Sequence, residues 1–406
     1  MNLKSIAFAA ALLGASLPAA AQQLDCGKSF GFRADINGSR GATLCSSNVD
    51  AFIDSAKNFT LSNAGYTQIS QATAMGRFND VNVVLRYDAR SNTLNYDFVE
   101  LGMRGSFTGA NRDESEELFE DYVKKGDILG KVLRYQAKNS PTSALTGQGG
   151  AIPMLAMADF NTSFDNASQI GVPDQNQTAN NLIGVGLSYG SYNIDGNEDV
   201  KTTSLPLSYT IRNNIDPRRQ LVLSMPLTQV TVDGAKAYHG GLGAAYRLPL
   251  TDRWTLTPGA RYSVVASKDR ATVSTVMSAS LMSTYVLPLG GFDLAMGNMV
   301  GVYKTGKFSS GDYSFDPDVN LKMTRNGLMA SVPTAMFGSK MAAEFSIIDT
   351  RYLGSEKPFV TDSQEVGITL GTNRKASNAR SFTRMGATYV RSKTTKGFTV
   401  NLGFWF

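Results

Sequence analysis

The stretch Gly397–Phe406 reads GFTVNLGFWF and alternates between two kinds of side chain. Its odd positions are mostly small or polar, and its even positions form an apolar row: Phe398, Val400, Leu402, Phe404 and Phe406. A period of two is that of a β-strand, so one face of this strand would be apolar and the other small or polar. Both a soluble sheet with an apolar core and a membrane strand facing lipid have this pattern.

The first residues of the chain have the features of an export signal. Lys4 supplies a positive charge, positions 6–17 are apolar, and the three alanines at 19–21 offer a small-x-small cleavage site. The apolar run is short for a retained helix, which must span about 30 Å of hydrocarbon. We therefore expect residues 1–21 to be a cleaved signal peptide.

With this signal in view, the stretch 397–406 resembles the closing strand of Gram-negative outer-membrane β-barrel proteins, which typically end on Phe after alternating apolar residues. The resemblance implies a location in the outer membrane. It also implies contact with outer-membrane lipid and recognition of the closing strand by the barrel-assembly machinery.

The composition of the 406-residue chain is compatible with a barrel. Only 18% of the residues are charged and 42% are hydrophobic, while the mean hydropathy is −0.15. In a membrane barrel only every second residue of a strand faces lipid, so the average stays near neutral. The formal net charge of +5 is too small to indicate nucleic-acid binding.

Residues 22–140 do not have the barrel pattern, and we expect a small α/β domain here. Helical spacing is present in 48–59, and strand alternation in 81–87 and 94–98. Residues 111–138 predict a longer helix, because its start is acidic and its end is basic, an order that complements the helix dipole.

Cys26 and Cys45 are the only cysteines of the chain. An exported protein meets an oxidising compartment, so we expect them to form a disulfide within this domain. No histidine or third cysteine lies nearby to complete a metal site. The sequence therefore predicts neither a metal nor another cofactor.

Residues 141–181 are rich in Gly, Pro, Ser, Thr, Asn and Gln and are predicted to be a linker, in which 152–164 could be a short helix or an extended strip. From Leu182 to Phe406 alternation is sustained over about twelve segments of the length that a membrane strand needs. These segments are 182–190, 205–211, 221–227, 238–248, 254–264, 277–287, 292–302, 319–332, 341–352, 366–370, 385–391 and 398–406. The predicted fold is mainly β: a C-terminal transmembrane antiparallel β-barrel behind a small N-terminal α/β domain.

The connections between these segments predict the orientation of the barrel. Counting back from a periplasmic C-terminus, turns near 216–217, 249–252, 288–291, 337–340 and 373–378 lie in the periplasm. Longer connections at 194–201, 305–317 and 354–363 then lie outside the cell, as is usual for such barrels.

Several cations share the small, polar face of their strands and are predicted to line the lumen. They are Arg212, Arg247, Arg261 and Lys322, with the only histidine, His239, on the same face. Three interpretations remain open: an anion-preferring pore, pairing with acidic residues of neighbouring strands, or binding of an acidic plug. The candidate plug is the helix of 111–138, through Glu116, Glu117 and Glu120.

The run Gly186–Gly190 matches the G-x-S-x-G nucleophile pattern, but it lies inside an alternating strand and not at a strand–turn–helix junction. Ser188 and His239 could form a lipid-hydrolase pair in a barrel. We favour a structural interpretation and expect no catalytic residue and no enzyme activity.

A barrel of about twelve strands behind an amino-terminal unit resembles autotransporters, in which a C-terminal barrel anchors or translocates its own N-terminal domain. The small disulfide-linked domain departs from the long repetitive passenger of that family. The alternatives are an outer-membrane diffusion channel or transporter with a basic lumen plugged by the N-terminal domain, and the Ser/His hydrolase. No extracellular partner can be named from these residues.

Overall fold

The computed structural model describes residues 24, 26–52, 54, 65–164, 181–195, 199–310, 313–336, 339–372 and 382–406. The predicted signal peptide and half of the predicted helix at 48–59 lie outside these residues. The chain divides into two compact units, with the boundary between Gly126 and Asp127.

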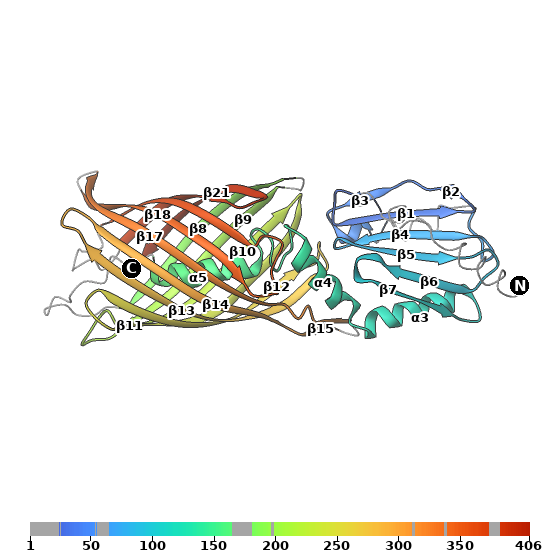
Figure 1. Cartoon of the computed structure of the whole chain (residues 1–406), viewed down its shortest axis with the longest axis horizontal. Coiled ribbons are helices and arrows are strands. Elements are labelled where there is room, and N and C mark those ends of the chain that lie inside the picture. The colour runs from blue at the N-terminus through green and yellow to red at the C-terminus, as the bar shows by residue number, and fades with distance from the viewer. Residues whose placement is uncertain are drawn as a thin grey trace, which may run out of the picture. The chain divides into compact units, whose positions relative to one another are not determined.

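The first unit is built on an antiparallel sheet in the order β2-β1-β4-β5-β6-β7, with β3 also paired to β1 (Figure 1). Its elements are β1 (Phe30–Ile36), β2 (Ser39–Arg40), β3 (Leu44–Ser46), β4 (Ala72–Phe78), β5 (Val81–Tyr87), β6 (Thr93–Phe98), the 3-10 helix η2 (Val99–Leu101), β7 (Met103–Thr108) and α3 (Arg112–Lys125). The predicted strands at 81–87 and 94–98 are β5 and β6. The Cys26–Cys45 disulfide is also confirmed, and it ties the residues before β1 to β3.

The two ends of helix α3 are set by Asn111 and Gly126. The side chain of Asn111 caps it by accepting a hydrogen bond from the backbone N–H of Glu114, and Gly126 ends it. Its apolar side packs on β6 and β7 through an aromatic cluster. That cluster is Tyr96, Phe98, Phe107, Phe119 and Tyr122.

The single helix predicted over 111–138 is two helices. Asp127 has a φ of 52°, a left-handed conformation that a continuing helix does not contain, and α4 (Ile128–Asn139) starts after it. Because the unit boundary lies at the same place, α3 belongs to the sheet unit and α4 to the second unit. The predicted domain limit at 140 is therefore too late.

The second unit is a closed antiparallel barrel of twelve strands, which confirms the predicted fold class (Figure 1). Its strands are β8 (Leu182–Ile194), β9 (Val200–Arg212), β10 (Gln220–Val232), β11 (Ala235–Pro249), β12 (Trp254–Ser267), β13 (Thr272–Pro288), β14 (Asp293–Gly306), β17 (Asn320–Met336), β18 (Ser339–Leu353), β19 (Asp362–Thr372), β20 (Phe382–Arg391) and β21 (Thr395–Trp405). The stretch 397–406 contributes β21, which closes the barrel by pairing with β8, as in Val400 opposite Tyr189.

The two ends of the barrel differ in their connections. We call the end with the connections 213–219, 250–253 and 289–292 the turn end, and the end with 268–271, 307–319 and 354–361 the loop end. The loop end holds the hairpin of β15 (Phe308–Ser310) and β16 (Tyr313–Phe315). It also holds the two-residue turn Asp233–Gly234, so the loop lengths differ less between the two ends than the sequence predicts.

The outer face of the barrel is an apolar belt. Outward side chains such as Leu242 and Ile347 are 69% and 62% exposed, which only a lipid environment would cover favourably. The apolar row of β21 is part of this belt: Phe398, Val400, Leu402 and Phe404 are all exposed.

Near the loop end the apolar side chains face inward and the polar ones outward. The outward side chains become charged and exposed, as at Lys201, Lys304 and Arg351. The inward side chains there become apolar and buried: Val200, Val232, Tyr303, Leu321 and Tyr352. This part of the barrel is therefore organised like a soluble barrel with an apolar core.

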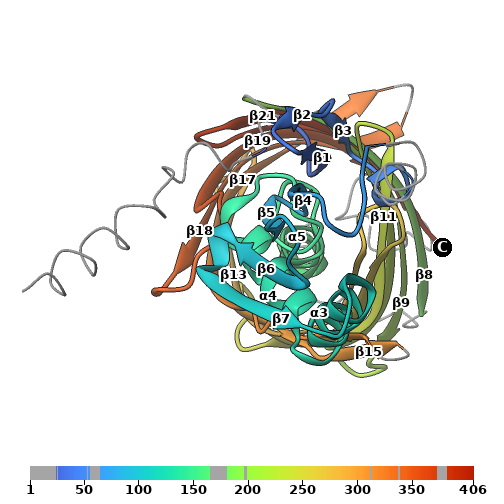
Figure 2. The same ribbon diagram turned by 90° about the vertical axis from the view of Figure 1, so that its right-hand side faces the viewer.

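The partner of that core comes from the predicted linker. Within residues 141–181, the first part is a buried coil and a helix, α5 (Ala151–Phe164), while 165–180 lie outside the described residues. Helix α5 lies in the barrel lumen against β11, β12, β13 and β14 (Figure 2). None of the described helices is long and apolar enough to span a membrane.

Candidate functional site in the barrel lumen

The lumen is occupied by residues 140–164, which we call the luminal segment. Its coil, 140–150, is closed by its own backbone: Gly147 donates to the carbonyl of Ser143, and Gln148 to that of Pro141. Almost every residue of the coil is buried. Helix α5 follows directly, and its apolar residues are spread around the helix without forming one face, which is typical of a helix with no solvent-facing side.

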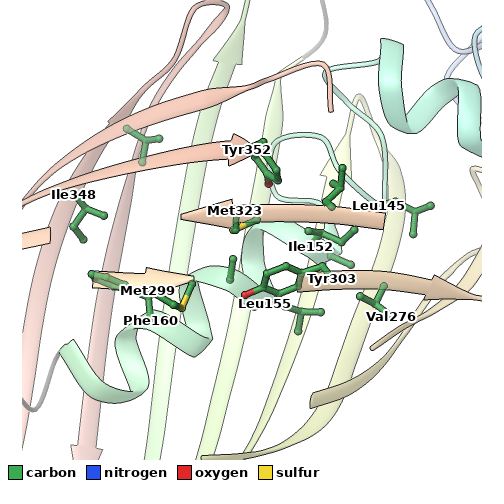
Figure 3. Packing of buried hydrophobic residues seen from close by; sticks show 14 of the residues in the cluster. Leu145, Ile152, Leu155, Phe160, Val276, Met299, Tyr303, Met323, Ile348 and Tyr352 are labelled. Atoms are coloured by element: carbon green, nitrogen blue, oxygen red, sulfur yellow. The ribbon is translucent and has the colours of Figure 1, made fainter. Parts of the chain in front are cut away.

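An apolar cluster joins the luminal segment to the barrel wall. Figure 3 shows side chains of the segment meeting side chains of the strands near the loop end. The segment contributes Leu145, Ile152, Leu155 and Phe160, and the wall contributes Val276, Met299, Tyr303, Met323, Ile348 and Tyr352. Burial of so many large side chains fixes the segment by the hydrophobic effect.

Asp159, the single charged residue of α5, accepts hydrogen bonds from several side chains of the wall. Arg261 of β12 donates to its Oδ1 from Nε at 3.0 Å and from Nη2 at 2.9 Å. Tyr303 donates to Oδ2 at 3.1 Å, and Ser278 donates to the same oxygen at 3.4 Å. The ion pair is buried on both sides and fixes the rotation of α5 in the lumen.

The end of α5 makes polar contacts with the wall near the turn end. The hydroxyl of Ser163 lies 2.9 Å from that of Thr257 and 3.2 Å from that of Thr284. Arg247 of β11 donates to the carbonyl of Thr162 and to the side chain of Gln220. The bond from Arg247 satisfies the carbonyl of Thr162, one of those that the helix end leaves free.

The coil is held in the same way near the loop end. His239 of β11 lies with Nε2 3.2 Å from the carbonyl oxygen of Gly149, and Arg270 donates to the carbonyl of Thr142 at 2.5 Å. Gly149 has a φ of +72°, and a Cβ there would lie 2.6 Å from Cγ2 of Thr202. Only glycine fits this position without strain.

Ion pairs also lie on the wall itself. Arg325 of β17 donates to both carboxylate oxygens of Glu365 at 2.8 Å, and its guanidinium lies 5.2 Å from the ring centre of Phe160. Arg384 of β20 pairs with Glu344 of β18. These pairs agree with the interpretation that luminal cations are neutralised by acidic groups, although Arg261 finds its partner on α5 and not on a strand.

The cations predicted to line the lumen do not all do so. His239, Arg247 and Arg261 lie inside and contact the luminal segment. Arg212 lies on the inward row at the turn end, opposite Gln220. Lys322 is exposed and lies between outward residues, so its predicted inward position is wrong. The prediction failed because near the loop end the apolar residues of β17, such as Leu321 and Met323, face the lumen, so that Lys322 between them faces outward.

The acidic helix predicted to plug the lumen belongs to the first unit. Glu116 accepts from the hydroxyl of Tyr87, Glu120 pairs with Lys124 of its own helix, and Glu117 is exposed. The luminal helix is α5, which sequence reasoning assigned to the linker. Its signal was an apolar run with one acidic residue, Asp159, which could have been matched to an inward arginine.

Ser188 and His239 both line a cavity that remains in the lumen beside α5. The G-x-S-x-G pattern around Ser188 is nevertheless not a nucleophile elbow. It lies within β8, which continues to Ile194. The elbow requires a sharp turn into a helix at this point.

A cavity of about 330 Å³ remains between α5 and the opposite wall. On the helix side it is lined by Met154, Met157 and Ala158. The wall side comes from β8, β9 and β10, from His239 and Arg247 of β11, from Arg261 of β12, and from β17 to β21. Within the described residues, no three His, Cys, Asp or Glu side chains are grouped so that they could hold a metal ion.

The second unit combines a closed barrel, an outer apolar belt and a luminal helix. The fold is that of an outer-membrane β-barrel. Among solved structures, the chain is similar to the β-domain of the Bordetella autotransporter BrkA, with 13% identity over 56% of this chain and 98% of that one (TM-score 0.41). The translocator domain of the autotransporter NalP from Neisseria meningitidis is 13% identical over 63% of this chain and 96% of that one (TM-score 0.46).

A channel is also among the similar structures. An outer-membrane channel from Pseudomonas putida F1 is 12% identical over 56% of this chain and 95% of that one, with a TM-score of 0.39. No protein-family model matches the chain, and no curated protein matches it in sequence.

Proposed function

We propose that this protein is an autotransporter-like outer-membrane anchor that presents its first unit at the cell surface and seals its own barrel with the luminal segment. Outer-membrane lipid is then the partner of the apolar belt. The observation that carries the proposal is the course of the chain through the barrel.

That course starts at the loop end. The side chain of Asp127, where the second unit begins, accepts a hydrogen bond from the backbone N–H of Asp316 in the 307–319 connection. Along α4, Arg134 pairs with Asp318, and Lys138 pairs with Glu356 of the 354–361 connection. The covalent chain from the first unit therefore enters the barrel at the loop end.

The chain then runs down the lumen to the turn end. Asp159 contacts Arg261, and Ser163, further along α5, contacts Thr257 and Thr284, which lie closer to that end. Strand β8 starts at the same end, where Asn181 contacts the backbone of Arg212. In outer-membrane barrels the longer loops lie outside, so a loop end at the cell surface would place the first unit outside.

The test uses single cysteines and a membrane-impermeant maleimide on intact cells. The full chain carries one substitution at a time: Lys393→Cys at the loop end, Gly291→Cys at the turn end, or Glu117→Cys on α3. Gly291 has open space around its Cα, and Lys393 and Glu117 are exposed, so none of these changes disturbs packing. The native cysteines are disulfide-bonded and do not react.

We expect the Lys393→Cys and Glu117→Cys variants to be labelled on intact cells. The Gly291→Cys variant should react only after the outer membrane is permeabilised. Labelling of the Gly291→Cys variant alone would reverse the orientation. Protection of the Glu117→Cys variant beside a labelled Lys393→Cys variant would contradict surface presentation of the first unit.

A diffusion channel is the second candidate, because the cavity beside α5 leaves part of the lumen unfilled. The occupant of the lumen in that case is α5 and not the N-terminal domain. Steady conductance of the parent protein in planar bilayers would favour a channel, whereas a silent parent that conducts only when α5 is displaced favours a sealed anchor.

A further inference from the structure

The two halves of the lumen have different chemistry. Helix α5 lies against β11, β12, β13 and β14, and the inward side chains of that half include buried apolar ones such as Met282, Ala295 and Met299. The cavity beside α5 lies mainly along the other half, from β17 to β21 and from β8 to β10. Serine and threonine are the commonest inward residues there. This half of the wall is therefore suited to a polar occupant and not to an apolar one.

Polar side chains from six neighbouring strands, β10, β9, β8, β21, β20 and β19, border the cavity. We call this set the polar band: Ser224, Ser208, Ser188, Asn401, Thr388 and Thr369. Ser224 lies directly opposite Ser208, and Ser188 directly opposite Asn401. Although all six point inward, five are half-buried and Asn401 is exposed. Their side chains therefore meet open space in the lumen.

The polar band has hydrogen-bonding capacity that the protein itself does not use. None of its six side chains has a hydrogen-bond partner among the residues that the structure describes. Fully buried hydroxyls nearby do have partners, as in Ser204 at 2.9 Å from Thr228 and Tyr192 at 2.8 Å from Thr399. Polar groups inside a protein are normally hydrogen-bonded. The polar band therefore needs partners from water or from a ligand in the cavity.

The helix side of the cavity is mostly apolar. Met154, Met157 and Ala158 line it, and Asn161 and Thr162 add polar groups towards the end of α5. Water gains few hydrogen bonds beside methyl and thioether groups, whereas C–H groups pack well on them.

An aromatic ring borders the cavity near the turn end. Trp405 lines it, and its ring lies over Gly184 and Gly403, where a Cβ would be 2.6 Å and 2.5 Å from ring atoms. Aromatic faces are partly negative and attract C–H groups. A molecule that matches the whole cavity therefore carries hydroxyl groups towards the polar band and C–H groups towards α5 and Trp405.

The charged groups of the cavity already have partners. Three arginines that line it form ion pairs: Arg325 with Glu365, Arg384 with Glu344, and Arg261 with Asp159. The fourth, Arg247, donates to Gln220 and to the carbonyl of Thr162. A charged ligand would compete with these bonds, whereas a neutral ligand leaves them intact.

From this arrangement we infer that the cavity beside α5 binds a small, uncharged, polyhydroxylated molecule of the size of one sugar ring. Its hydroxyl groups bond to the polar band, and its C–H face packs on Met154, Met157 and Trp405. The cavity volume of about 330 Å³ is at the small end of the range for ligand sites, which favours a single ring over a longer chain. The inference goes beyond the anchoring function and is independent of which end of the barrel faces outside.

Equilibrium dialysis with radiolabelled glucose tests the site. The full chain is purified in a phosphocholine detergent, which has no sugar head group to compete. Both ends of the barrel then meet the same solution, so the result does not depend on orientation or on surface presentation of the first unit. We expect saturable binding. No saturable binding would overturn the inference and leave water as the partner of the polar band.

A double variant, Thr369→Val with Thr388→Val, removes two hydroxyls of the polar band at nearly unchanged shape. The dissociation constant for glucose should rise about tenfold, because two modest hydrogen bonds are lost. Thr203→Val is the matched control, since Thr203 is exposed on the outward face of β9, and it should leave binding unchanged. Equal binding by the double variant and the parent would contradict the proposed site.

Glucuronate separates a neutral ligand from an anionic one, because it matches glucose in size but carries a carboxylate. We expect it to bind more weakly than glucose. Tighter binding of glucuronate would overturn the assignment to an uncharged molecule.

Heat-modifiable migration on gels reports whether each variant has folded. If the double variant does not assemble, Ala158→Phe, which fills the cavity from the helix side, decides in its place and should lower glucose binding severalfold. Binding at the parent level in a folded Ala158→Phe variant would contradict the proposed site.

Discussion

Asp159 is the residue that ties α5 most specifically to the wall, since its carboxylate receives bonds from Arg261, Tyr303 and Ser278 at once. Removing one partner of a buried ion pair leaves an uncompensated charge and costs about 3–5 kcal/mol, whereas replacing both partners with apolar groups is often neutral. The pair therefore specifies position more than it adds stability.

We predict that Asp159→Asn weakens docking of α5 by roughly 3 kcal/mol. The measurement is conductance in planar bilayers, which should rise as α5 leaves its site. A double variant, Asp159→Leu with Arg261→Met, should return conductance towards the parent level. Equal conductance of the single and double variants would show that the buried charge of Arg261 is not the cause.

Glu116 gives the first unit a pH-dependent contribution. Partial burial first, and then the charge of Asp113, raise the pKa of its carboxyl, while the hydrogen bond from Tyr87 acts in the opposite direction. A carboxyl whose pKa is raised on folding stabilises the fold below its ordinary pKa, and this contribution is lost as the pH rises through the folded value.

Glu116→Gln should therefore make the first unit slightly more stable than the parent at neutral pH. The gain should be at most about 0.5 kcal/mol, because much of the side chain still meets water. This gain in stability should disappear as the pH falls below the ordinary pKa of a carboxyl. Urea unfolding followed by the near-ultraviolet circular dichroism of tyrosine measures it, and Glu117→Gln, an exposed neighbour, is the control.

At the scale of elements, two glycines of the wall allow α5 to pack closely against it. A Cβ at Gly297 of β14 would lie 2.6 Å from Cδ2 of Phe164, and one at Gly327 of β17 would lie 2.9 Å from Cζ of Phe160. The two rings themselves are neighbours on the helix, with centroids 4.7 Å apart and planes tilted by 44°. The missing side chains of the wall therefore make the space for the helix.

Gly297→Ala should displace α5 by overpacking, at a cost of about 1–3 kcal/mol. Limited proteolysis of the luminal segment in detergent should become faster. Gly291→Ala, in a connection with open space around it, is the matched control and should leave the rate unchanged. An unchanged rate in Gly297→Ala would mean that the helix ring has room to move aside.

At the scale of the whole molecule, the two units have separate cores. The apolar cluster of the luminal segment involves only residues of the barrel unit, and the cluster around Cys26 and Met75 involves only the first unit. Each unit therefore has the packing it needs to fold by itself.

We predict that a chain lacking 24–126 but keeping 1–23 still assembles as a barrel. It should migrate on gels in a heat-modifiable way, as the full chain should. Removing 127–164 instead should lower the temperature of the gel transition, because the apolar inner wall near the loop end would lose its partner and meet water. Equal transitions in the two deletions would contradict a stabilising role for the luminal segment.

The sequence on its own determined the elements whose pattern is local. Alternation with a period of two is visible along each strand, so the twelve strands and the apolar belt of Phe398, Val400 and Leu402 could be predicted. The Cys26–Cys45 disulfide could be predicted because the chain offers no other pair of cysteines. Inward positions of Arg247 and Arg261 followed from the same alternation.

Only the tertiary structure decided what fills the barrel. The charge of α3 favoured that helix as a plug, but Gly126 and the left-handed Asp127 separate it from the second unit. Alternation also does not say which row faces inward, and near the loop end α5 and its coil turn the apolar row of β17 inward and leave Lys322 outside. The pairing of Arg261 with Asp159 joins residues 102 positions apart. Only closure of the barrel around the luminal segment brings them together.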